Sequence, residues 1–265
     1  MNKERDGINF IVCGLEHSGT TLVSDLLRQL PGCDSGFECG VLLVNQPSEF
    51  SRLEPFVSNI LKGWEITREN LKLCLEKSSF NEFYDELYER SELFSSSEAP
   101  SIRFDKTPRY IAHIQKVSQR ASGKPILAMM KDPRAILWSD FKRSGHKIDK
   151  INAWYDEWLP AKKRYMEAAY SGYEYCMKNS DQCLVVKLED LCFCAQETLK
   201  KIDHFLELEY NPLQFHLSSK RYMHTKGNSI DISTAVEHLA SLPTKISLDI
   251  ANELKHLDRW FYNFN

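Results

Sequence analysis

Short runs of apolar residues alternate along this chain with longer segments in which apolar residues recur every three or four positions. The clearest runs cover residues 8–13, 125–130 and 183–187, and weaker strand candidates lie at 34–38 and 101–104. A strand that is buried on both faces has an unbroken apolar run, and strands that alternate with helices form parallel sheets. The pattern therefore predicts an α/β fold with a central parallel sheet and helices on both faces.

The segments between the strands have the spacing of amphipathic helices. Leu22, Leu26, Leu27 and Leu30 would share one face of a helix. By the same reasoning, helices are predicted at 22–30, 80–88, 108–119, 135–141, 149–179, from 191 to about 206, and 246–261. The last of these would be a terminal helix docked on the rest of the chain.

Two segments depart from simple strand–helix alternation. Residues 41–98 show no strong strand pattern and are predicted to be mainly helical, with a loop at 95–97. Segment 149–179 is predicted to form one or two helices interrupted near Pro160, because proline removes a hydrogen bond within a helix. We expect one domain over 1–265, with 41–98 and 149–179 as helical excursions and the first of them a lid or insertion on the substrate side.

Composition places the chain among ordinary globular proteins. Of its 265 residues 42% are hydrophobic and 27% are charged, and the formal net charge is −3. A chain without excess positive charge is not expected to bind nucleic acid or an anionic membrane, so any anion site must be local. The N-terminus is polar, and no apolar run approaches the roughly 18 residues that a membrane span needs. We expect a cytoplasmic protein without a membrane span.

Eight cysteines are scattered through the sequence, and none has the C-x-x-C spacing of a metal site. We therefore expect buried free thiols and no bound metal. If the chain were secreted, Cys33 and Cys39 would be the pair to test for a disulfide.

The loop at 14–21, Gly-Leu-Glu-His-Ser-Gly-Thr-Thr, separates the first predicted strand from the first predicted helix. The first amides of a helix have no partner within it, and with the helix dipole they can bind a phosphate. Thr20 and Thr21 add hydroxyl donors there. Thr20 stands where the nucleotide-triphosphate loop has lysine, which argues against a nucleoside-triphosphate enzyme. An ordinary glycine turn after a buried strand is the other interpretation.

The loop resembles the 5′-phosphosulfate loop of sulfotransferases, which use 3′-phosphoadenosine 5′-phosphosulfate (PAPS) as sulfuryl donor. His17 occupies a position that is usually Lys or Arg in that family. A second segment, 131–139, resembles the family signature in which a basic residue at a strand end and a serine eight positions later bind the 3′-phosphate; here these are Lys131 and Ser139. The resemblance implies a three-layer sandwich like that of P-loop NTPases.

Three further segments resemble sulfotransferase motifs. Segment 105–110 resembles the Lys-Thr-Pro motif, whose lysine lies near the sulfuryl group and corresponds to Lys106. Segment 185–191 resembles a late strand followed by Glu-Asp-Leu, in which the carboxylates cap the next helix. Segment 224–228, which contains Lys226, Gly227 and Asn228, resembles a C-terminal loop that closes on the 3′-phosphate.

The reaction needs a base to accept the proton of an acceptor hydroxyl. The resemblance to protein-tyrosine sulfotransferases places Glu38 in this role, with His17 and His113 as alternatives. Lys106 and His17 would stabilise charge on the leaving oxygen. The expected catalytic residues are Glu38, His17 and Lys106, and the expected donor-binding residues are Leu15, Glu16, His17, Ser18, Gly19, Thr20, Thr21, Lys131, Arg134, Ser139, Lys226, Gly227 and Asn228.

The resemblance thus implies sulfuryl transfer from PAPS to a hydroxyl of a carbohydrate, phenol or other small molecule, without a metal. A P-loop kinase or nucleotide hydrolase would share the architecture, and Mg²⁺-dependent ATP turnover would distinguish it. A relative that binds nucleotide without turnover is the third possibility. The acceptor and the oligomeric state are not encoded in any of these motifs.

Overall fold

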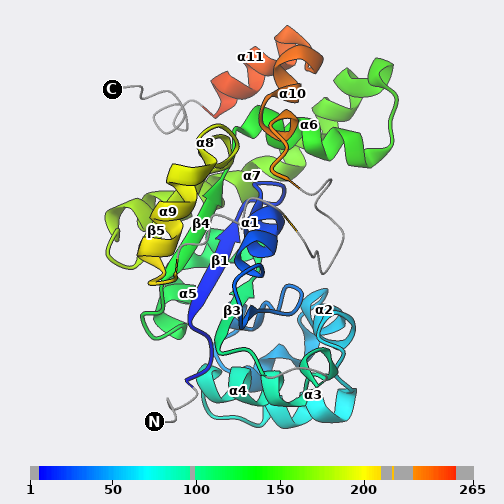
Figure 1. The fold of residues 1–265 in the computed structure, drawn as a ribbon. Helices are drawn as coiled ribbons and strands as arrows, with labels where there is room; N and C mark the ends of the chain where they lie inside the picture. Colours follow the sequence, from blue (N-terminus) through cyan, green and yellow to red (C-terminus); the bar gives the residue numbers. More distant parts are fainter. Residues whose placement is uncertain (1–5, 96–98, 210–216, 218–228, 255–265) are drawn as a thin grey trace.

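A computed structural model describes residues 6–95, 99–209, 217 and 229–254. Its centre is a parallel sheet of five strands in the order β2-β3-β1-β4-β5 (Figure 1). The strands are β1 (Phe10–Gly14), β2 (Cys33–Asp34), β3 (Ile102–Lys106), β4 (Ile126–Met130) and β5 (Cys183–Lys187). The predicted α/β fold with a parallel sheet is therefore confirmed.

Helices connect the strands and extend beyond both ends of the sheet. In Figure 1, α2, α3 and α4 lie at one end of the molecule, whereas α6, α10 and α11 lie at the other. The α-helices are α1 (Thr20–Leu27), α2 (Phe56–Gly63), α3 (Arg68–Leu75), α4 (Phe80–Arg90), α5 (Ile114–Arg120), α6 (Pro133–Ser144), α7 (Ile151–Lys178), α8 (Leu188–Phe193), α9 (Ala195–Phe205), α10 (Ser233–Ser241) and α11 (Thr244–Glu253). Short 3₁₀ helices are η1 (Val41–Leu43), η2 (Pro47–Arg52), η3 (Glu92–Phe94), η4 (Pro108–His113) and η5 (Ile148–Lys150).

Side chains alternate between the two faces of each central strand. In β1, Ile11 and Cys13 join the core beneath α5 and α7, whereas Phe10 and Val12 join the core beneath α1, α8 and α9. All five residues of β1 and of β4 are buried. An unbroken apolar run is the pattern that a strand covered on both faces requires.

Two predicted boundaries are wrong. The second strand covers Cys33–Asp34 instead of 34–38, so Glu38 lies in a loop beyond it. Beyond the strand the chain is held by other contacts: Phe37 O accepts a hydrogen bond from Trp64 Nε1 at 2.7 Å. The predicted helix at 108–119 begins as the 3₁₀ helix η4, and α5 starts only at Ile114.

The predicted break near Pro160 is also wrong, because α7 is continuous from Ile151 to Lys178. Proline leaves the carbonyl four residues earlier without its helical partner. Pro160 and Asp156 are both exposed, so water can satisfy that carbonyl, while Trp158 and Met166 pack into one core on either side. The packing of this helix face therefore outweighs the cost of the hydrogen bond that Pro160 removes.

Other expectations have mixed outcomes. Cys33 and Cys39 are free, and all the cysteines are buried thiols except Cys194, which is exposed. The terminal helix α11 covers Thr244–Glu253, and the rest of the predicted segment to 261 lies outside the described residues. Across the described part of the chain, no helix has the length and hydropathy of a membrane span.

Candidate functional site

The loop between β1 and α1 has a fixed backbone. Gly14 has φ 149°, and a Cβ there would stand 2.1 Å from Met129 O on the neighbouring strand. The next amide, Leu15 N, donates to Tyr173 Oη at 2.9 Å, and that hydroxyl donates to Met129 O at 2.6 Å. The start of the loop is thereby tied both to β4 and to α7.

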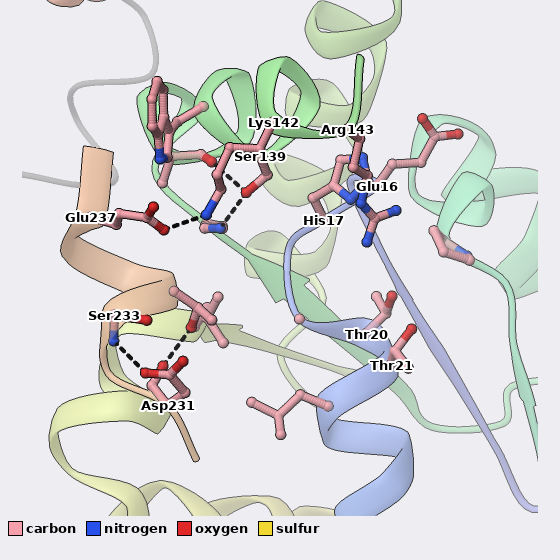
Figure 2. Close-up of a pocket in the computed structure, with 18 of the residues that line it drawn as sticks. Glu16, His17, Thr20, Thr21, Ser139, Lys142, Arg143, Asp231, Ser233 and Glu237 are labelled. Atoms are coloured by element: carbon pink, nitrogen blue, oxygen red, sulfur yellow. Dashed lines mark hydrogen bonds and ion pairs between the residues drawn. The ribbon is translucent and has the colours of Figure 1, made fainter. Parts of the chain in front are cut away.

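His17 has φ 68°, in the left-handed region that few non-glycine residues adopt. Gly19 precedes α1 with φ 94°. The first amides of this eight-residue helix have no acceptor within the helix, so they can donate to a bound anion. The predicted sequence of strand, tight loop and helix is therefore present, with Thr20 and Thr21 in the first turn (Figure 2).

A pocket of about 590 Å³ opens between the start of α1, helix α6 and helix α10 (Figure 2). The predicted site residues that line it come from three separate parts of the sequence. They are Glu16, His17, Gly19, Thr20, Thr21, Glu38, Lys131 and Ser139. The predicted residues Leu15, Ser18, Lys106 and Arg134 lie outside its lining, and Lys226, Gly227 and Asn228 lie outside the described residues.

Lys131 and Ser139 meet at the side of the pocket formed by α6. The ammonium of Lys131 donates to Ser139 Oγ at 3.1 Å, and that hydroxyl donates to Ala135 O at 2.8 Å. Lys131 is 3% exposed, and this burial lowers its pKa to about 8. Among the described residues no carboxylate forms an ion pair with Lys131. A buried cation beside a hydroxyl is a suitable environment for a phosphate.

Arg134 has a different environment. Its guanidinium Nε lies 3.0 Å from Asp132 Oδ1, and its amide donates to the same oxygen at 2.8 Å. Asp132 therefore caps the start of α6. Its pKa is held far below the usual range: burial alone would raise it, but the His238 ring, 3.6 Å from Oδ2, and the hydrogen bonds from Arg134 outweigh that effect. Arg134 stabilises the helix start, and it does not face the pocket.

Glu38 and Lys106 form the second polar pair. Lys106 Nζ lies 2.9 Å from Glu38 Oε1 and 4.7 Å from the centre of the Phe37 ring. Lys106 is 1% exposed, whereas the Glu38 side chain is 25% exposed and lines the pocket. Burial lowers the pKa of Lys106, although the nearby Glu38 carboxylate opposes this shift. Lys106 thus lies behind the glutamate that faces the cavity.

A buried network that the sequence did not suggest fixes this pair. Asp105, the residue before Lys106, accepts hydrogen bonds from Tyr84 Oη and Tyr110 Oη at 2.6 Å each, and from Thr107 Oγ1 at 2.8 Å. Thr107 Oγ1 also accepts from Gly40 N at 3.1 Å. Burial raises the pKa of Asp105, and the three hydroxyl donors oppose that shift. The network connects β3 to the loop that carries Glu38.

The pocket also includes groups that no motif indicated. Asp231, Ser233, Thr234, Glu237 and His238 approach it from or near α10. Glu237 forms an ion pair with Lys142 of α6, which joins the two helices across the pocket (Figure 2). These residues are distant in the sequence from the predicted motifs, so only the folded structure shows that they border the pocket.

The His17 side chain contacts an acidic residue of α6. Its Nε2 lies 2.6 Å from Oδ1 of Asp140, the residue that follows Ser139 on α6. The two side chains form an ion pair when the imidazole is protonated. The site therefore combines helix-start amides, a buried Lys131, a His17–Asp140 pair and a Glu38–Lys106 pair.

The described residues contain no cluster of three or more His, Cys, Asp or Glu arranged for a metal ion. Cations, hydroxyls and amides are the donors around the pocket, and donors of these kinds suit two separated anionic groups.

Comparison with protein-family models gives a match to the "Sulfotransferase family" over residues 9–212, which include most of the site. The chain belongs to the sulfotransferase family. A search of curated proteins returns no match. The predicted family membership is confirmed, and the match supports sulfotransfer activity in general.

Solved structures similar to this sulfotransferase confirm the fold. The sulfotransferase domain of an olefin synthase from Synechococcus PCC 7002 has a TM-score of 0.66 at 17% identity, covering 100% of this chain and 99% of that domain. The sulfotransferase domain from the curacin biosynthetic pathway has a TM-score of 0.65 at 15% identity, covering 95% and 99%. A sulfotransferase from Mycobacterium avium has a TM-score of 0.51 at 14% identity, covering 96% and 77%.

Proposed function

We propose that this sulfotransferase moves a sulfuryl group from PAPS to a hydroxyl of a small molecule or carbohydrate. The observation that carries the proposal is that Lys131 and Ser139 border the same pocket as the first turn of α1. Family membership supports the transfer of sulfate. The two separate anion-binding regions support a donor with phosphate groups at both its 3′ and 5′ positions.

In this proposal the 5′ end of the donor lies at the loop 15–21. The first amides of α1 and the hydroxyls of Thr20 and Thr21 donate to its oxygens, and His17 supplies positive charge. Lys131 and Ser139 bind the 3′-phosphate, which compensates the buried ammonium. Bound in this way, PAPS supplies an activated sulfuryl group.

Glu38 accepts the proton of the acceptor hydroxyl in this scheme. The new bond joins the acceptor oxygen to sulfur, and the bond from sulfur to the oxygen on the 5′-phosphate breaks. Lys106, 2.9 Å from Glu38, orients the carboxylate and stabilises negative charge in the site. Because Lys106 is buried behind Glu38, the glutamate is the member of the pair that can reach the acceptor.

The first test measures transfer of labelled sulfate from PAPS to a panel of alcohols, phenols and sugars. Glu38→Gln should reduce kcat by about 10²- to 10⁴-fold, the range for loss of a general base. The affinity for 3′-phosphoadenosine 5′-phosphate (PAP) should change by less than about threefold, because the base does not bind the nucleotide.

The matched control is Glu69→Gln, which removes a carboxylate from an exposed position of α3. It should have no effect on turnover. Turnover by Glu38→Gln at the wild-type rate would remove Glu38 from the mechanism. Mg²⁺-dependent ATP hydrolysis without sulfate transfer would instead assign the chain to nucleotide hydrolases.

A further inference from the structure

The environment of His17 sets this chain apart from a loop with Lys or Arg at the same position. A lysine or arginine is a cation over the whole physiological pH range, whereas an ordinary histidine titrates near neutrality. His17 therefore provides positive charge to an anion only when its ring is protonated.

Asp140 lies close enough to His17 to stabilise a protonated ring. Its Oδ1 lies 2.6 Å from His17 Nε2, and its Oδ2 accepts a hydrogen bond from Trp158 Nε1 at 2.8 Å. The indole is only 6% exposed, and the side chains of His17 and Asp140 are 15% and 13% exposed. Both carboxylate oxygens are therefore engaged in a nearly closed environment, where charge interactions are stronger than in water.

The other charged groups around this pair come from three elements. Lys162 of α7 lies 3.5 Å from Asp140 Oδ2 and 3.2 Å from Glu16 Oε2. Arg109 of η4 lies 3.8 Å from Glu16 Oε1, and Arg143 of α6 lines the same pocket. Lys162 and Arg109 thus share Glu16, the residue before His17, and Arg143 borders the same pocket.

Asp140 places a negative charge in direct contact with the His17 ring. The ion pair also acts on the acid: burial would raise the pKa of Asp140, but the hydrogen bonds from His17 and Trp158 lower it below its ordinary value. The carboxylate is therefore ionised at neutral pH, which is the state that stabilises an imidazolium.

We infer that Asp140 is a positioning residue that holds His17 protonated and oriented toward the 5′ end of the donor nucleotide. The inference rests on the proposed function, because it takes the nucleotide to be PAPS. Asp140 and His17 together replace the permanent cation, Lys or Arg, that is usual at this position of the loop in the family. Asp140 itself does not touch the nucleotide.

The test is titration calorimetry with PAP at pH values from about 6 to about 8, the range in which histidine titrates. Asp140→Asn keeps an acceptor for Trp158 but removes the charge. It should weaken PAP binding about tenfold or more at pH 7, and the loss should shrink at pH 6, where acid restores protonation. Asp156→Asn, an exposed acid on α7, is the control for net charge.

The second background is His17→Arg, which carries a permanent charge. In this background Asp140→Asn should reduce PAP affinity by less than about twofold, because arginine stays charged without a neighbouring carboxylate. Thermal unfolding of each variant establishes that it is folded. An equal loss in both backgrounds, or no loss in either, would overturn the inference.

Two further outcomes are distinguishable. If His17→Arg binds PAP but has lost turnover, then His17 is the proton acceptor and the inference is wrong. If wild-type protein itself fails to bind PAP, the proposed function fails, whereas normal PAP binding with a silent Asp140→Asn overturns only the role of Asp140.

Discussion

Single residues in this site have their properties set by burial and by one or two partners. Lys131 is the clearest example, because removal from water lowers the pKa of its ammonium to about 8. The protonated form is the one that binds a phosphate. Among the described residues no carboxylate forms an ion pair with Lys131, although the charge of Glu189 acts on it, and a bound anion would offset the remaining cost of burial.

This property gives a pH dependence with a definite sign. Below pH 8 Lys131 is charged and PAP binding is strongest; above pH 8 the affinity should fall by up to about tenfold per pH unit, as the lysine must first gain a proton. Calorimetric titrations at about pH 7 and 9 measure the change. Lys131→Arg should show a much smaller change, because arginine stays protonated.

Lys178→Arg, at an exposed position near the end of α7, is the control and should keep the wild-type profile. Ser139→Ala should bind more weakly but retain the same pH dependence. A flat wild-type profile between these pH values would show that Lys131 does not bind the ligand.

At the scale of elements, α7 holds the site together from behind the sheet. Tyr173 binds the start of the loop, Trp158 binds Asp140, and Lys162 lies beside both Glu16 and Asp140. One tight approach fixes the position of this helix: a Cβ on Gly172 would stand 1.9 Å from Ile111 O of η4. Backbone cannot yield as a flexible side chain can.

Gly172→Ala should therefore lower the free energy of unfolding by about 1–3 kcal/mol, the usual cost of overpacking, despite the better helix propensity of alanine. Urea denaturation measures this change. Ser171→Ala at the adjacent exposed position should remain within about 0.5 kcal/mol of wild type. Equal stability of the two variants would mean that α7 can move away from η4 without cost.

The elements themselves were largely predictable from the sequence, because a strand buried on both faces must be an apolar run. The strands at 125–130 and 183–187 lie within a residue of the prediction. Prediction failed where a long-range contact decides the structure. After the short second strand, Phe37 O is bonded to Trp64, 27 positions away, and core packing keeps α7 continuous at Pro160.

For the whole molecule, the loop and the segment 131–139 were found from their motifs because each is continuous in the chain. The roles given to Glu38 and Lys106 came from resemblance alone, and the structure places these residues 2.9 Å apart although 68 positions separate them. Asp140 and the Asp105 network were missed, because an acidic residue in a helix or strand has no local sign of its partner.

The side of the pocket near α10 was also beyond prediction. Lys142 and Glu237 are 95 positions apart and meet only because the fold brings α6 and α10 together. The first turn of α1, Lys131 and Ser139 all border one cavity.

Calorimetric titration with PAP of the wild type, Lys131→Ala and Ser139→Ala tests this arrangement most directly. We predict a 1:1 complex with the wild type and a loss of affinity of about tenfold or more in each variant, the usual effect of removing a hydrogen bond to a charged group. Wild-type protein that does not bind PAP, or variants that bind it equally well, would contradict the account.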